Sequence, residues 1–155
     1  MLLSLWGLNM AQFKVQGMEG LMLTLQEIEN IPEDVQDKML SAAADAALPI
    51  LRKSIIEKGI VRTGQLRDSL KVTHKKDKKT NKIQYFVAPA GKRRREGKEK
   101  KTISNTTVGF FNEFGAPKKG IPARRWIGSV LEEIADAAAA AETRVYDEWL
   151  QSKNI

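Results

Sequence analysis

The sequence has 155 residues, of which 42% are hydrophobic, enough for one folded domain with a modest core. It contains no cysteine, which excludes disulfide frameworks, thiolate metal sites and cysteine nucleophiles. The single histidine, His74, excludes multi-histidine metal sites and disfavours Ser-His-Asp catalysis. The composition therefore favours a binding or structural role, and we expect no catalytic residue, bound metal or cofactor.

Positive charge is concentrated in one segment of the chain. The formal net charge is +7, but residues 71–101 contain 13 basic and 3 acidic residues, a local balance of +10. The rest of the chain has 13 basic and 16 acidic residues, a balance of −3. This asymmetry predicts a localised contact with phosphate groups or with an acidic protein surface.

The N-terminal part of the chain predicts two short elements. Residues 1–9 are apolar but lack the basic flank and cleavage pattern of a signal peptide, and they are too few to span a membrane. Alternation of Phe13 and Val15 with polar residues predicts a strand over 11–18. Apolar residues at spacings of three and four then predict a short helix over about 18–28.

A long helix is predicted from about Pro32 to Lys58. Proline at a first helical position, followed by acidic residues, is a start signal, and Gly59 is a suitable C-terminal cap. The apolar stripe of this helix is wide, which predicts that it lies against a sheet or between layers. Pro49 is expected to kink or interrupt it.

The middle of the chain predicts a β-hairpin. Thr63 and Gly64 first provide a turn or a helix start. Residues 71–75 and 83–89 are rich in strand-forming side chains and flank the turn-forming sequence DKKTNK. We therefore expect two antiparallel strands joined by a short turn.

The most basic part of the chain, residues 91–101, has no large apolar side chain, so we expect an exposed loop. Three interpretations stay open: contact along a nucleic-acid backbone, contact with an acidic protein, or a solvated loop that maintains solubility. No aromatic residue lies within the loop, which argues against base stacking. The candidate contacts to DNA or an acidic partner are Lys92, Arg93, Arg94, Arg95, Lys98, Lys100 and Lys101.

Residues 112–127, NEFGAPKKGIPARRWI, combine chain-breaking residues with core-sized side chains. Glycines such as Gly115 permit backbone conformations that other residues disfavour, and prolines such as Pro122 stiffen the chain, so an ordered connector is predicted. Two interpretations remain for it. It is either a well-packed connection to the last helix or part of an intersubunit surface, with Arg124 and Arg125 at its rim.

The connector is flanked by two predicted elements. Residues 102–111 have a strand-like composition, and apolar residues at helical spacing predict a C-terminal helix over about 127–150. The order of elements predicts an α+β fold: a small antiparallel sheet, with a long N-terminal-half helix and a C-terminal helix packed on one face. We expect an N-terminal extension over 1–12 and a single domain over 13–155.

The sequence offers no constellation typical of an enzyme. Paired carboxylates such as Glu132 and Glu133 lie on a predicted helix surface, which is ordinary for solvated helices. There is no cluster of acids suited to a metal ion and no phosphate-binding or dinucleotide fingerprint. A metal-dependent nuclease is therefore the least favoured hypothesis.

Two motifs, in this order, resemble the small tail-component proteins of long-tailed lambdoid-type phages, described as tail-completion or head–tail joining proteins of the neck. RTGQLRDSL is similar to the family's TG-x-L-x-x-S segment, and the connector is similar to its EFG…PARPFL run before a terminal helix. Arg125 stands where proline is usual in the family, and Trp126 where phenylalanine is usual. The motif or interface residues implied are Thr63, Gly64, Leu66, Glu113, Phe114, Gly115, Pro122, Arg124, Arg125 and Trp126.

The resemblance implies a non-enzymatic virion protein, made in the host cytoplasm, that forms a ring at the head–tail junction. Its expected partners are copies of itself in a hexamer or dodecamer, other neck, connector and tail-tube proteins, and DNA passing through the channel, but no membrane. An alternative hypothesis from the residues alone is a stand-alone nucleic-acid-binding protein that uses residues 71–101.

Overall fold

The computed structural model describes residues 31–94 and 102–153. The chain divides into two units, residues 1–33 and 34–155. The described helices and strands belong to the second unit, apart from Glu33, which is the first residue of the first of these helices.

Three predicted features fall on residues that the structure does not describe. They are the strand over 11–18, the helix over about 18–28 and the part of the basic loop at 95–101. The division into an extension over 1–12 and a domain from residue 13 likewise stays a prediction.

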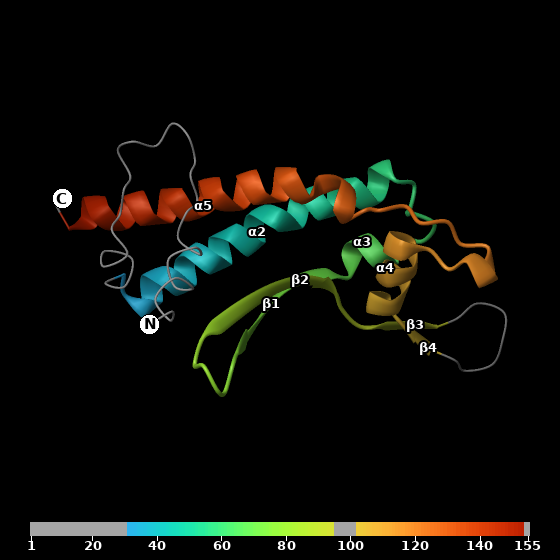
Figure 1. The fold of residues 1–155 in the computed structure, drawn as a ribbon, viewed down its shortest axis with the longest axis horizontal. Helices are drawn as coiled ribbons and strands as arrows, with labels where there is room; N and C mark the ends of the chain where they lie inside the picture. Colours follow the sequence, from blue (N-terminus) through green and yellow to red (C-terminus); the bar gives the residue numbers. More distant parts are fainter. Residues whose placement is uncertain (1–30, 95–101, 154–155) are drawn as a thin grey trace, which may run out of the picture. The chain divides into compact units, whose positions relative to one another are not determined.

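The longest helix, α2 (Glu33–Glu57), confirms the helix predicted in the N-terminal half of the chain (Figure 1). It continues through Pro49, so the predicted interruption is wrong. Proline removes one N–H donor from a helix, and the exposed position of Pro49 lets water reach the carbonyl group that loses its donor. The buried side of the helix includes Leu51, Ser54 and Ile55.

The predicted β-hairpin is confirmed. A single helical turn, α3 (Gln65–Asp68), leads into β1 (Leu70–Lys76), which pairs antiparallel with β2 (Ile83–Pro89). The hydroxyl of Tyr85 in β2 donates a hydrogen bond of 2.9 Å to a carboxylate oxygen of Asp37 in α2. The hairpin is therefore tied to α2 by a polar contact as well as by packing.

A second small sheet corrects two predictions about the following segment. Strand β3 (Lys92–Arg94) pairs with β4 (Thr102–Ser104), so the segment predicted as an exposed loop begins as a strand. Ladder hydrogen bonds join backbone groups, which is why a run of basic side chains does not prevent pairing. The predicted strand over 102–111 is wrong beyond Ser104, because α4 (Asn105–Phe114) begins there.

Helix α4 begins at a side-chain cap. The hydroxyl oxygen of Ser104 accepts the backbone N–H of Thr107 at 3.0 Å, which is the contact that N-cap residues make. The β-branched and aromatic residues of α4 suit a strand by propensity, but propensity is a weak preference that a cap and tertiary packing override.

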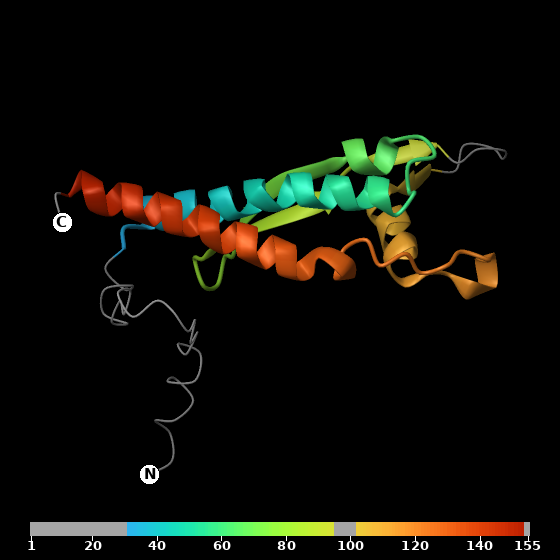
Figure 2. The same cartoon turned by 90° about the horizontal axis from the view of Figure 1, so that it is seen from above.

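The predicted C-terminal helix is confirmed as α5 (Leu131–Ser152). It begins later than predicted, because a 3₁₀ turn, η2 (Gly128–Val130), precedes it. Helix α5 lies alongside α2, and the β1–β2 hairpin lies on the other side of α2 (Figures 1 and 2). The α+β class, with the long helices on one face of a small antiparallel sheet, is as predicted.

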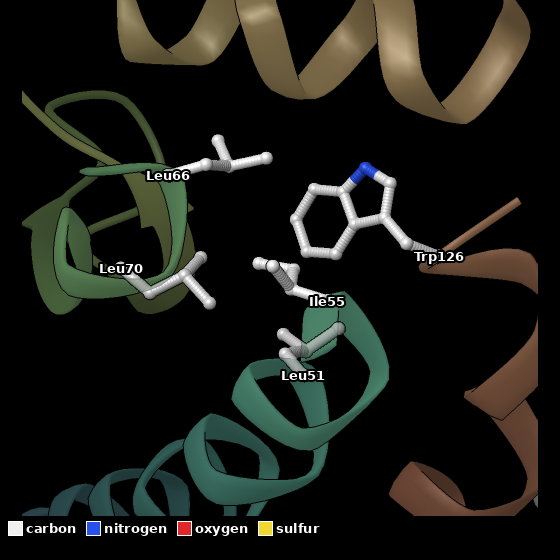
Figure 3. Close-up of a cluster of buried hydrophobic side chains, with 5 residues drawn as sticks. All are labelled: Leu51, Ile55, Leu66, Leu70 and Trp126. Atoms are coloured by element: carbon white, nitrogen blue, oxygen red, sulfur yellow. The ribbon is translucent and has the colours of Figure 1, made fainter. Parts of the chain in front are cut away.

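The core cluster consists of five residues from α2, α3, β1 and the connector. Leu51 and Ile55 of α2 meet Leu66 of α3, Leu70 of β1 and Trp126, which lies just before η2 (Figure 3). Partly buried residues of β2 and α5 pack around this cluster. The end of the connector is therefore part of the core.

Candidate functional site

The first motif, Thr63 to Ser69, builds the α3 turn and places one leucine in the core. Gly64 has φ +68°, a left-handed conformation that glycine adopts without steric cost. Leu66 is 2% exposed, and its carbonyl oxygen accepts a hydrogen bond of 2.8 Å from the Ser69 hydroxyl. Thr63 itself is exposed. The motif therefore shapes the backbone and fills the core.

Trp126 in the second motif is a core residue. Its side chain is 1% exposed, and its Nε1–H donates a hydrogen bond of 2.9 Å to the carbonyl oxygen of Gly109 in α4. The carbonyl oxygen of Trp126 accepts the Ser54 hydroxyl of α2 at 2.6 Å. Both polar groups are satisfied, so the residue locks α2 and α4 to the connector.

Gly109 allows α4 to approach the tryptophan closely. A Cβ atom at this position would lie 3.2 Å from Pro89 Cγ and 3.3 Å from the Trp126 ring. A glycine within an aromatic segment is the one signal of this contact in the sequence, and a strand was expected there instead of a helix. The role of Gly109 was therefore missed.

Glu113 is buried and stabilises the start of η2. Its carboxylate oxygens accept the backbone N–H groups of Ile127 at 2.7 Å and Gly128 at 3.0 Å. A carboxylate at a helical N-terminus pairs free N–H donors and favours the helix dipole. Glu113 therefore joins the end of α4 to the segment that leads into α5.

Gly115 ends α4 with a conformation that requires glycine. It has φ +79°, and a Cβ atom there would lie 2.8 Å from the backbone nitrogen of Ala123. Beyond it, η1 (Pro117–Lys119) lies within a tight loop that Ala116 and Ile121 close by backbone hydrogen bonds. The connector is thus an ordered loop folded back on α4.

The two connector arginines lie in different environments. The Arg124 backbone N–H donates to the Asn112 carbonyl oxygen at 2.7 Å, and its guanidinium donates to the Gly59 carbonyl oxygen at 2.8 Å. A cation beside the C-terminal carbonyls of α2 suits the helix dipole. Arg125 has φ +51° and is exposed, as is Pro122. Arg124 therefore supports the fold, whereas Arg125 and Pro122 face solvent.

Large apolar side chains of α4 and of the segment that leads into α5 remain exposed. Phe110 and Phe114 of α4 are 57% and 56% exposed, and their ring centroids lie 4.8 Å apart. Leu131, the first residue of α5, is 56% exposed, and Ile127 is also exposed. We call Phe110 and Phe114 the aromatic patch. Exposed apolar clusters of this kind mark interaction surfaces.

The basic candidates lie partly in β3. Lys92 is exposed, and Arg93 is partly buried, with no hydrogen-bond partner for its Nε and Nη2 among the described residues. Burial lowers the pKa of the Arg93 guanidinium from its ordinary value. Arg94 ends β3. The other candidates, Arg95, Lys98, Lys100 and Lys101, lie outside the described residues.

Within residues 31–94 and 102–153, no three or more histidine, aspartate or glutamate side chains come together in a way that could hold a metal ion. Over the same ranges, no helix is both long and apolar enough to cross a membrane.

Comparison with models of known protein families shows which family the chain belongs to. The family model described as "Bacteriophage HK97-gp10, putative tail-component" matches residues 24–115, more than half of the chain. The chain belongs to the HK97-gp10-like family. The match spans the Thr63 motif, the hairpin and α4 as far as Gly115. Neither the curated proteins nor the solved structures compared with the chain give a match.

Family membership identifies the chain as a bacteriophage tail component. A tail component is a structural part of the virion and contacts other structural proteins of the phage. The resemblance drawn from the two sequence motifs is thereby confirmed at the level of the family.

Proposed function

We propose that this HK97-gp10-like chain is a structural protein of the phage head–tail junction. In this proposal, copies of the chain form a closed ring that completes the tail or joins it to the head connector. Family membership supports the tail component, and the aromatic patch is the observation that carries the proposal of assembly.

The patch lies on a framework that packing and hydrogen bonds hold in place. Trp126 secures α4 through Gly109, and Glu113 secures the end of α4 to the start of η2. Phe110 and Phe114 are nonetheless left exposed on the same helix. A fixed surface that exposes aromatic rings is suited to docking, because little conformational entropy is lost when it is covered.

The exposed members of the implied interface set fit this role better than the buried ones. Thr63, Phe114, Pro122 and Arg125 face solvent, so a neighbouring subunit could contact them. The buried motif residues act by shaping the surface on which the exposed residues lie.

Electron microscopy and light scattering of the purified protein test the proposal, alone and with the neighbouring neck proteins. A ring of fixed copy number is the expected result, and phage lacking the protein should yield filled heads and tails that remain separate. Normally joined particles without the protein, or a protein that stays monomeric with all its neighbours, would end the proposal.

A second candidate, DNA contact by the basic segment, has one specific observation in its favour. The Arg93 guanidinium is partly buried, two of its donors lack acceptors among the residues that the structure describes, and a phosphate oxygen could accept from them. In a ring, such contacts would line the DNA channel. Filter binding of duplex DNA should then weaken steeply with salt. A salt-independent result, or no binding by the assembled ring, would exclude it.

A further inference from the structure

We infer that an open groove between α2 and α3 receives the beginning of α5 from a second copy of the chain. This inference rests on the proposed ring, and it names the two surfaces that form the repeating contact.

The groove presents apolar side chains that no described element covers. It has a volume of about 570 Å³ and is lined on α2 by Leu48, Pro49 and Ile56. Ile56 is 49% exposed, so much of its apolar surface is open to a partner. The space is large enough for a few side chains of an incoming helix.

The same groove carries an excess of positive charge. Arg52 donates a hydrogen bond of 3.2 Å to a main-chain carbonyl at the start of β1, which holds its guanidinium at the groove. Lys53 lies 3.7 Å from Glu57, with both side chains more than half exposed, so water screens that pair. Glu57 of α2 and Arg67 of α3 complete the lining, and Arg67 is paired with Asp68.

The beginning of α5 has the complementary chemistry. Leu131 is exposed and is followed by Glu132, Glu133 and Asp136, all of which are exposed. Among the described residues, no ion pair neutralises these three carboxylates. The helix has no basic residue before Arg144. An apolar residue beside several acids therefore faces solvent, just after the turn that Glu113 holds.

Most of the groove lies away from the α5 of its own copy. Val130 and Ile134 pack against the core cluster that contains Leu51 and Ile55, and Leu48 also packs there. Pro49, Lys53 and Ile56 point to a different side of α2, because each residue advances about 100° around the axis. Charge and apolar complementarity favour α5 of another copy as the occupant of the groove.

Two different surfaces that fit each other form a heterologous contact, which closes into a ring when the rotation is right. The groove segment of α2, from Leu48 to Glu57, is about 14 Å long at the usual helical rise, enough for roughly the first two and a half turns of α5.

Charge reversal on each surface tests the inference under conditions in which the unmodified chain forms its ring. One variant carries Arg52→Glu with Lys53→Glu, and the other carries Glu132→Lys with Asp136→Lys. Each variant alone brings like charges together, and we expect association about 100-fold weaker, with monomers in light scattering. Lys75→Glu with Lys76→Glu, on exposed positions of the hairpin, is the matched control and should form the normal ring.

Mixing the two variants gives the decisive measurement. Every contact in an alternating ring would again join opposite charges, so the mixture should assemble although neither variant does. Circular dichroism and thermal melting confirm that each variant is folded. Rings formed by either variant alone, or a mixture of folded variants that stays monomeric, would overturn the inference. After either of these two results, a ring formed by the unmodified chain would still support the proposed function. If the unmodified chain forms no ring, the proposed function and this inference both fail.

Discussion

The core side of the connector and the aromatic patch differ in what their side chains contact. Trp126 and Glu113 are buried, and hydrogen bonds satisfy their polar groups within the chain. Phe110 and Phe114, on the same helix as Glu113, are more than half exposed. Most residues that carry the family resemblance, such as Leu66 and Trp126, build a framework, whereas Phe114 belongs to the same motif and is exposed. Substitutions on the two sides should therefore separate stability from assembly.

Removing the indole side chain of Trp126 from the core should have the largest effect on stability. Trp126→Ala leaves a cavity in the core and removes the hydrogen bond to Gly109, so we expect a loss of about 3–5 kcal/mol in the free energy of unfolding. Urea denaturation followed by circular dichroism measures it. Trp126→Phe, which keeps an aromatic ring in the core, should lose less. Equal stability of Trp126→Ala and the unmodified chain would place this residue outside the core.

Gly115 and Gly120 provide a matched pair within the connector. Both have positive φ, but a Cβ atom at Gly115 meets the Ala123 backbone at 2.8 Å, whereas a Cβ atom at Gly120 meets nothing within 4 Å. Gly115→Ala should therefore cost about 2–3 kcal/mol, and Gly120→Ala only about 1 kcal/mol. Thermal melting of the two variants gives the comparison. Equal costs would show that backbone conformation alone, without the close approach, determines the effect.

Substitutions in the aromatic patch should weaken assembly of the ring and leave the fold stable. Phe110→Ser with Phe114→Ser removes exposed rings, so the free energy of unfolding should change by less than about 1 kcal/mol. Ring formation in light scattering should be abolished, because the apolar surface is lost. Phe86→Ser, at an exposed aromatic position on β2, is the control that should leave assembly intact. If the double variant forms normal rings, the patch is not an assembly surface.

The smallest expected effect is a pH dependence of stability that comes from Glu142, which belongs neither to the connector nor to the aromatic patch. Burial raises the pKa of Glu142 in α5 above its ordinary value, so its charged form is disfavoured in the folded chain. Its contribution to stability is then fully present below the unfolded pKa and is lost as pH rises through the folded pKa. Glu142→Gln should melt slightly higher than the unmodified chain at pH 7, and the difference should vanish in acid. A difference independent of pH would contradict this origin.

Local signals were sufficient for the elements that depend on local chemistry. The apolar stripe of α2, the turn between β1 and β2 and the alanine-rich α5 are each visible as a spacing or a turn in the sequence. Helix α4 was missed because its threonines, valine and phenylalanines have strand propensity, and only the Ser104 cap signals a helix start.

The site was less predictable, because its contacts join residues far apart in the chain. Nothing near Glu113 indicates that its carboxylate binds the N–H groups of Ile127 and Gly128. The same holds for the contact of Trp126 with Gly109, which depends on how α4 lies over the core. The residue pattern indicated that the connector is ordered, but which of its side chains face solvent required the three-dimensional fold.

The carboxylate of Glu113 has a mechanical consequence for the connector. Its two hydrogen bonds join α4 to the residues at the start of η2, so a force applied to α4 is transmitted directly to the segment that leads into α5. A force that a neighbouring subunit applies to α4 would thereby reach α5 without extending the connector between Glu113 and Ile127.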